Sequence, residues 1–175
     1  SIADNMDAAK AAIQGGLIDP DATGAEVKKV VEQLTTVARV TGEDIPAAVR
    51  AASQAVRTGM AQDFTEAFDL IIRAQQTGLN AAGDIMDTVN EYSTQFRKLG
   101  LDGEEAFGLI AQAVQGGARD ADVAADALKE FSIRSIDGSK STGEALQDLG
   151  LSWKGIHNAI AAGGPSAKAA FRQVV

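Results

Sequence analysis

The sequence predicts an all-α fold, a compact multi-helix array of about ten short antiparallel helices joined by glycine-terminated turns. Apolar residues recur at helical spacing along the whole chain. Ser, Thr, Asp or Pro residues precede each apolar stretch, and glycines follow it, which are the start and stop signals of helices. No stretch alternates apolar and polar residues between hairpin turns, as a half-buried strand would. Most expected connections are short, which favours antiparallel neighbours.

Residues 99–118 contain one complete unit of this pattern. One helix ends at Gly100, Leu101 folds back onto it, and Asp102 begins the next helix. Asp102 and Glu105 match a capping box, in which each side chain accepts a hydrogen bond from the backbone N–H of the other residue. The helix that follows carries an apolar stripe formed by Phe107, Ile110 and Val114.

The other helices are placed by the same signals. The first is expected over residues 2–14, and the longest over residues 81–99. Further capping boxes are expected at Thr23 with Glu26, at Asp63 with Glu66, and at Ser141 with Glu144. Helices are also expected to begin at Pro46, Asp120, Ser152 and Pro165, the one from Asp120 running to about Ile136. Expected ends are Gly15, Gly42, Gly59, Gly78, Gly150 and Gly163.

We expect one domain with a weak internal seam. Residues 1–136 form the helical array, residues 137–143 (DGSKSTG) form a polar flexible break, and residues 144–175 add C-terminal helices of the same domain. The chain begins without Met, and an apolar stripe is still running at its end, so we expect a fragment of a longer protein.

An internal duplication supports the array. The sequence EAFDLIIRAQQTGL (66–79) aligns without a gap with EAFGLIAQAVQGGA (105–118). Shorter helix-ending signatures also recur, but one glycine capping geometry produces similar sequences everywhere. The spacings between units are irregular, so we do not expect a regular solenoid such as the 34-residue helical repeats.

Composition argues against several classes of function. The net charge is −8, which disfavours binding through phosphate neutralisation and docking on anionic membranes. The three basic pairs (Lys28 with Lys29, Arg97 with Lys98, and Lys168 with Arg172) are isolated among carboxylates and are explained as solvated helix faces. No apolar run approaches the roughly 18 residues of a membrane span. The absence of cysteine removes thiolate nucleophiles and cysteine metal sites.

No motif for catalysis or for a cofactor is present. His157, the only histidine, has Trp153 and Ile156 beside it and is interpreted as a structural residue of an apolar helix face. Ser152 lies nearby, but GLSWKG is not the G-x-S-x-G nucleophile elbow and no strand precedes it. The glycine pairs form neither a Walker sequence nor a dinucleotide fingerprint. We therefore predict a protein that is not an enzyme, with no catalytic, cofactor-binding or metal-binding residues.

Two acidic segments leave a calcium site as a minor alternative. Residues 19–24 (DPDATG) place Asp19, Asp21, Thr23 and Gly24 as in the first half of an EF-hand loop. The twelfth position, where such a loop needs a glutamate, is Val30. Residues 120–126 (DADVAAD) lack the central glycine, and their twelfth position is Phe131. Acidic residues at helix N-termini explain both segments better.

The order of three short motifs resembles bacteriophage tail tape-measure proteins, over roughly residues 45–175. An acidic helix start precedes Asp87–Thr94, the turn LGLDGEEA covers residues 99–106, and a helix ends with AVQGG at residues 113–117. The small residues that follow this glycine in many relatives are here Arg119, Asp120, Ala121 and Asp122. The resemblance carries over no catalytic residue.

The resemblance implies a structural and assembly segment of a phage tail, involved in tail length and tail-tube assembly. The implied partners are tail-tube and tail-assembly proteins, with self-association as a further contact, and neither nucleic acid nor membrane. The implied location is the tail lumen of the virion, after assembly in the host cytoplasm. The alternative is a helical interaction module that binds a partner in a groove between its helices; such a module should expose a sizeable apolar patch.

Overall fold

The computed structural model describes residues 2–175, with side-chain surroundings from residue 5 onward, as ten α-helices and no strand in that range. The helices are α1 (Ile2–Gln14), α2 (Gly24–Thr41), α3 (Ile45–Thr58), α4 (Phe64–Gln76), α5 (Ile85–Lys98), α6 (Gly103–Gln115), α7 (Ala121–Asp137), α8 (Lys140–Asp148), α9 (Trp153–Ala162) and α10 (Gly164–Phe171). The predicted all-α array of short helices is therefore confirmed.

Side-chain caps explain why many of these helices begin where they do. The N-cap side chain accepts a hydrogen bond from a backbone N–H three residues later at Thr23, Asp44, Asp63, Asp102, Asp120 and Ser152. The predicted capping boxes at Thr23 and Asp102 are complete. The box predicted at Asp63 is not, because Glu66 accepts its hydrogen bond from the N–H of Gln62 (2.7 Å).

Several predicted helix starts differ from the structure. Those predicted at Pro46 and Pro165 lie one residue earlier, at Ile45 and Gly164. The helix predicted over residues 81–99 begins only at Ile85, so α2, with 18 residues, is longer. The buried Asn80 explains the delay, since its Oδ1 accepts the N–H of Ile85 (3.0 Å) while its Nδ2 donates to Gln75 (2.7 Å), which holds the preceding turn. The helix predicted to start at Ser141 starts at Lys140 instead.

The predicted break at residues 137–143 is mostly helical. Asp137 is the last residue of α7 and Lys140 the first of α8, so only Gly138 and Ser139 connect the two helices. Gly138 adopts the left-handed conformation (φ 78°) that ends α7. The weak seam between residues 1–136 and 144–175 stays a prediction.

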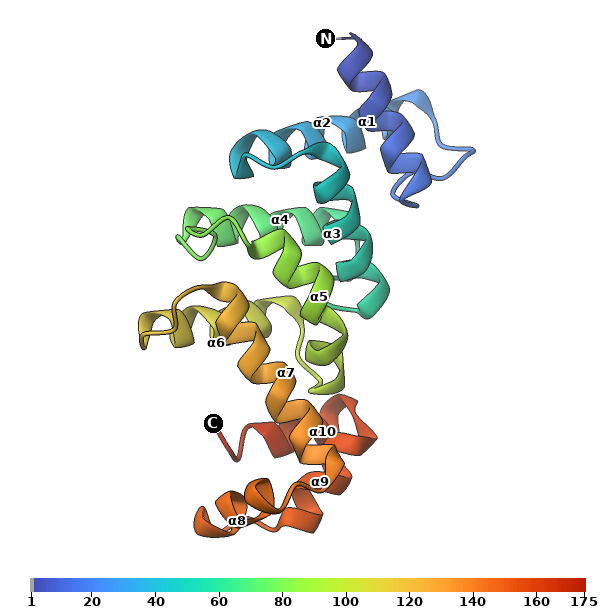
Figure 1. Ribbon diagram of the computed structural model, residues 1–175. Helices are drawn as coiled ribbons and strands as arrows, with labels where there is room; N and C mark the ends of the chain where they lie inside the picture. The colour runs from blue at the N-terminus through green and yellow to red at the C-terminus, as the bar shows by residue number, and fades with distance from the viewer. Residues whose placement is uncertain (1) are drawn as a thin grey trace.

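The helices stack in two layers (Figure 1). One layer contains α1, α3, α5, α7 and α9, and the other contains α2, α4 and α6, with α8 beyond them. From α1 to α5, each helix contacts the next helix or the next but one, and most contact both. The N-cap residues Thr23, Asp63, Asp102 and Ser139 recur 40, 39 and 37 residues apart. The stack is thus more regular than the spacing of sequence motifs indicates. The positions at which helices begin repeat at nearly constant intervals, whereas the amino-acid motifs within the helices do not.

The two duplicated segments are neighbours in this stack. Residues 66–79 lie in α4 and the turn after it, and residues 105–118 lie in α6 and its turn. The two helices pack side by side in the same layer. Both end at a glycine with positive φ, Gly78 (78°) and Gly117 (112°). The sequence similarity therefore corresponds to equivalent positions in successive helix pairs.

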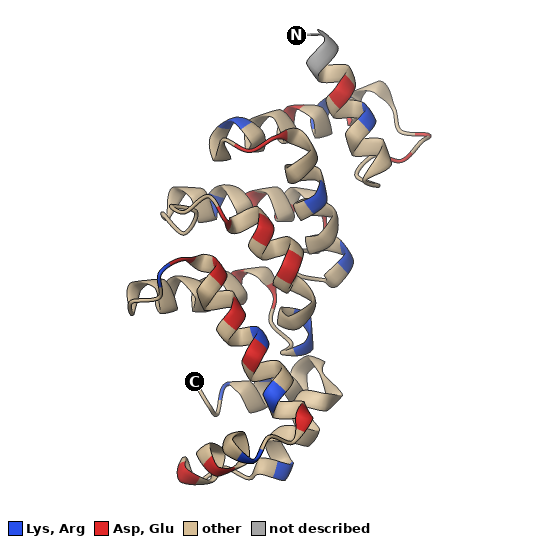
Figure 2. Cartoon of the chain, in the orientation of Figure 1, with Lys and Arg blue, Asp and Glu red and all other residues tan. Residues whose placement is uncertain are grey.

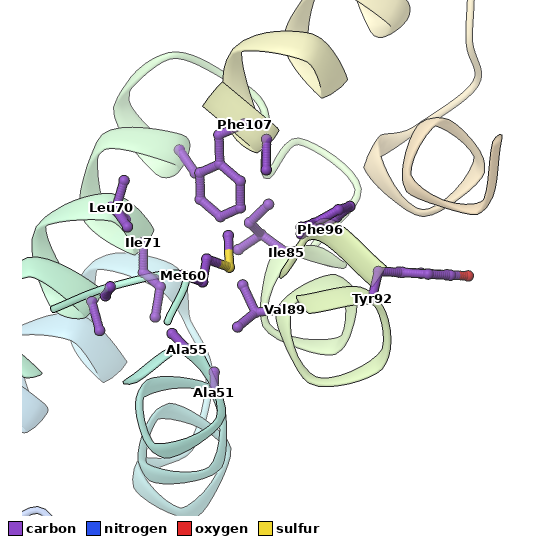
Figure 3. Packing of buried hydrophobic residues seen from close by; sticks show 14 of the residues in the cluster. Ala51, Ala55, Met60, Leu70, Ile71, Ile85, Val89, Tyr92, Phe96 and Phe107 are labelled. Atoms are coloured by element: carbon purple, nitrogen blue, oxygen red, sulfur yellow. The ribbon is translucent and has the colours of Figure 1, made fainter. Parts of the chain in front are cut away.

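The core runs between the two layers and is rich in alanine. Figure 3 shows Met60, Ile85 and Phe107 converging from three segments, with Ala51 and Ala55 of α3 below them. These side chains are all buried. Small residues let the backbone approach closely, as at Gly103, whose N–H donates to the carbonyl of Met60 (2.8 Å). A Cβ atom there would lie 2.7 Å from that carbonyl oxygen.

The C-terminal helices fold back onto the middle of the stack. The first residue of α10 packs on the turn after α5, where a Cβ atom on Gly100 would lie 2.1 Å from the carbonyl oxygen of Gly164. Glu105 Oε1 lies 2.5 Å from Lys168 Nζ and 2.8 Å from Arg172. We call this ion-paired contact between α6 and α10 the clasp (Glu105, Lys168, Arg172).

Candidate interaction surfaces

A groove lies between α1 and α2 at the N-terminal end of the stack. Its volume is about 800 Å³. Met6, with 68% of its surface exposed, and the half-buried Val27 give it an apolar floor, while Lys28 and Glu32 form an exposed ion pair at its rim. We call it the N-terminal groove; its lining residues are Asn5, Met6, Ala9, Gly24, Val27, Lys28, Val31, Glu32, Thr35, Thr36 and Arg39.

A smaller hollow of about 260 Å³ lies between α4 and α6. Leu70 and Phe107 lie at its base. Arg73 and Glu104 also line it, and their side chains pair across it at 2.5 Å. A hollow bridged in this way joins two helices of the same chain and leaves little room for a further helix.

Acidic residues recur along α5 and α7 (Figure 2). Asp84 Oδ2 accepts the N–H of Asp122 (2.9 Å), and Asp122 in turn accepts the hydroxyl of Tyr92 (3.1 Å), which links the two helices. Burial and the neighbouring Asp122 raise the pKa of Tyr92 well above its usual range. The hydroxyl therefore stays protonated and keeps donating, a structural use of these groups. We call this surface the acidic face (Asp84, Asp87, Glu91, Asp122, Asp126 and Glu130).

His157 does not join a catalytic group. Its Nδ1 lies 3.1 Å from the carbonyl oxygen of Ser135, and its ring stands 5.4 Å from that of Trp153. The Ser152 hydroxyl accepts the N–H of Gly155 (3.1 Å) as the cap of α9. These contacts fit the structural interpretation of both residues.

The segment at residues 19–24 uses its polar atoms internally. Asp19 accepts the N–H of Asp21 (2.9 Å), and Thr23 forms the capping box of α2. Among the residues that the structure describes, no three His, Asp or Glu side chains lie close enough together to hold a metal ion.

The basic pairs differ from one another. Lys28 lies at the exposed rim of the N-terminal groove, as expected for a solvated face. Lys168 and Arg172 do not fit that expectation, because both bind Glu105 in the clasp. Sequence reasoning missed this contact because 63 and 67 residues separate the partners, and no local pattern reports such a distance. It also missed the N-terminal groove, because Met6 and Val27 have the helical spacing of ordinary core residues.

None of the helices in residues 2–175 is long and apolar enough to cross a membrane. The surfaces described above are a groove at the N-terminal end of the stack and an acidic face along α5 and α7.

The comparison with known families decides the affiliation. The model of the phage-related minor tail protein family matches residues 1–175, the whole chain. The chain belongs to this family. It is also similar to a protein described as a probable tape measure protein of Streptomyces phage phiC31, with 44% identity over 165 residues. No solved structure matches the chain significantly.

The extent of these matches defines what is established. The similarity covers 94% of this chain but 23% of the phiC31 protein, so the chain spans about a quarter of that relative. The predicted resemblance to a segment of a tape measure protein is confirmed. The family is one of phage tail proteins, which agrees with a structural role.

Proposed function

We propose that this chain is a folded structural segment of a tape measure protein that acts in tail-tube assembly and in setting tail length. It would act in the tail lumen of the virion and, during assembly, in the host cytoplasm, in contact with tail-tube and tail-assembly proteins. The observation that carries the proposal is the 44% identity to a probable tape measure protein over nearly the whole chain.

The fold specifies how such a segment would contribute to length. A continuous helix of 175 residues would be about 260 Å long, at about 1.5 Å per residue. Here the chain reverses direction at the nine turns between the described helices, each of which contains a glycine with positive φ, such as Gly42 and Gly59. A segment that keeps this fold adds far less than 260 Å to a ruler. We infer that it acts as a folded unit within the tape measure protein.

Tail length measured by electron microscopy tests the proposal. The phage would carry an in-frame deletion of the 175 residues in its tape measure gene. Tails shortened by much less than about 260 Å, or blocked in assembly, support a folded assembly unit. Uniform shortening by about 260 Å would mean that the segment works as extended ruler. Normal numbers of infectious, full-length tails would remove the proposed role altogether.

The acidic face suggests why the segment would not bind DNA that shares the tail channel. Carboxylates repel the phosphate backbone, and Asp87 and Glu91 are both exposed. Replacing both residues by lysine in the phage should slow DNA ejection. Ejection at the normal rate in that variant would contradict this part of the proposal.

The alternative of an interaction module is favoured by one observation, the N-terminal groove. A tail protein held there would bind the isolated chain, and Lys28→Glu with Arg39→Glu would weaken binding without unfolding, since Lys28 is exposed and Arg39 lies on the groove side. Binding that ignores these substitutions would rule out the groove as its site.

A further inference from the structure

We propose that the N-terminal groove is the docking site of one more helix of the same stack, supplied by tape measure sequence that precedes residue 1. The helix would lie against α1 and α2 as α4 lies against α5 and α6. This inference concerns the extent of the fold, and it holds whether or not the segment sets tail length.

The first support is the order of contacts in the stack. Helix α2 contacts α3 and α4, and helix α4 contacts α5 and α6. A helix placed just before α1 would, by the same rule, contact α1 and α2. The N-terminal groove is lined by α1 and α2 and by nothing else. The groove therefore lies where the stacking rule places the preceding helix.

The second support is the face that each helix of this layer turns to the helix before it. The fifth and ninth residues of α6, Phe107 and Ala111, line the hollow shared with α4. The fifth and ninth residues of α4, Phe68 and Ile72, line the hollow shared with α2. The fifth and ninth residues of α2 are Lys28 and Glu32, and both line the N-terminal groove.

The first residues of α2 and α6 repeat this relationship. Gly103 begins α6, and a Cβ atom on it would lie 2.4 Å from Leu70 of α4. Gly24 begins α2 and also lines the groove, but a Cβ atom there would meet nothing within 4 Å. The same residue at the same position thus has its neighbour in α6 and lacks it in α2.

The chemistry of the groove defines the helix that fits it. Met6 and Val27 require apolar side chains opposite them, whereas Lys28 and Glu32 replace the Phe and apolar residue of the inner helices. The incoming helix must therefore be amphipathic, with polar or charged residues facing this pair. Since exposed charges are screened by salt, its docking should weaken as ionic strength rises.

Cysteine labelling tests the proposal, because the chain has no cysteine of its own. Lys28→Cys places a thiol in the groove, and Arg50→Cys places one on the exposed surface of α3 with the same loss of charge. Maleimide labelling of each site would be followed by peptide mass spectrometry in the 175-residue chain and in the full tape measure protein. We expect Lys28→Cys to react at least about tenfold more slowly in the full protein than in the 175-residue chain, whereas Arg50→Cys should react at the same rate in both.

Three outcomes would overturn the proposal. Equal labelling of Lys28→Cys in both proteins would mean that the groove stays open. Protection in the 175-residue chain that grows with its concentration would assign the groove to a second copy. Protection of the full protein only after addition of another tail protein would assign it to that partner.

A second variant separates docking from folding. Gly24→Leu adds bulk in open space, so the 175-residue chain should keep its thermal midpoint. In the full protein the same side chain should displace the docked helix and restore fast labelling of Lys28→Cys. Slow labelling that persists in this double variant would contradict the proposed docking site.

Discussion

Glu105 Oε1 lies 2.5 Å from Lys168 Nζ, and this pair joins helices whose contacting residues are 63 positions apart. Glu105 also accepts the N–H of Asp102 as part of a capping box, so one carboxylate both begins α6 and holds α10. The two side chains are 23% and 29% exposed, less than Arg73 and Glu104, whose pair joins α4 to α6 with 61% and 64% exposed.

Glu105→Gln should lower the free energy of unfolding by about 1 kcal/mol. Glutamine can still serve the capping box, so the change isolates the charge that Lys168 and Arg172 lose. The matched control is Glu104→Gln, whose pair with Arg73 is about two-thirds exposed and should contribute less than about 0.5 kcal/mol. Urea unfolding of both variants measures the difference, and equal losses would contradict the clasp.

Stability should fall in acid through the same residue. Burial favours the neutral form of Glu105, but the hydrogen bond and charge of Lys168 outweigh it and lower the pKa below its ordinary 4.5. A carboxylate whose pKa is lower in the folded chain stabilises the fold at pH values above its unfolded pKa. This stabilisation is lost as the pH falls from about 4.5 toward the folded pKa. Unfolding measured from about pH 6 to about pH 3 should therefore show a smaller loss of stability in acid for Glu105→Gln than for the unchanged chain. Parallel curves of stability against pH for the two proteins would exclude Glu105 as a source of the loss of stability in acid.

Gly100→Ala should be the most costly of the turn-glycine substitutions. Any alanine at a positive φ costs about 1 kcal/mol. At Gly100 the new Cβ would also lie 2.1 Å from the carbonyl oxygen of Gly164, so the start of α10 must move. Gly78→Ala, with a similar φ and open space, is the control. Thermal unfolding should place Gly100→Ala well below this control; equal midpoints would mean that the two turns separate without cost.

Gly103→Ala and Gly24→Ala should have opposite effects in the 175-residue chain. Both glycines are first residues of helices, where alanine is the better helix former. At Gly103 the added Cβ meets Leu70 and the Met60 carbonyl, so we expect destabilisation by about 1–3 kcal/mol. At Gly24 it meets nothing, so stability should be equal or slightly higher. Chemical unfolding measures both, and a stable Gly103→Ala chain would contradict the close approach of α6 to the turn after α3.

Calcium should leave the thermal midpoint unchanged. Asp19 and Thr23, the first ligands of the EF-hand alternative, bind backbone and capping groups instead. Calorimetry in roughly millimolar calcium, and again in the presence of a chelator, tests this expectation. A higher midpoint with calcium would revive a cation site at residues 19–24.

The sequence predicted what depends on near neighbours along the chain. The capping boxes at Thr23 and Asp102 are correct, and the partners of each lie within one helical turn. The same spacing did not produce a box at Asp63, where Glu66 accepts from Gln62, or at Ser141, which lies inside α8. The start of α5 was missed because Asn80, five residues away, caps it from within a buried turn. Start signals of this kind are not distinguished from ordinary turn asparagines by any local pattern.

The layers and surfaces depend on contacts that sequence alone does not order. The clasp and the close approach at Gly100 both join residues more than 60 positions apart. The N-terminal groove was missed for a different reason. Its apolar residues, such as Met6 and Val27, have ordinary helical spacing, and only the fold distinguishes a covered stripe from an open one.

The order of contacts in the stack also governs how the chain would respond to pulling. Since most helices touch only those next to them or next but one, tension applied at the N-terminus would detach helices singly, with a separate rupture for each. The C-terminal end differs, because Arg172 is tied to Glu105 and closes a loop of 67 residues. Tension from that side would meet the clasp first, and only after it breaks would α7–α9 unravel. The two ends of the molecule thus differ in their resistance to force. Helices at the N-terminal end detach at low force, whereas the C-terminal end is held by the clasp.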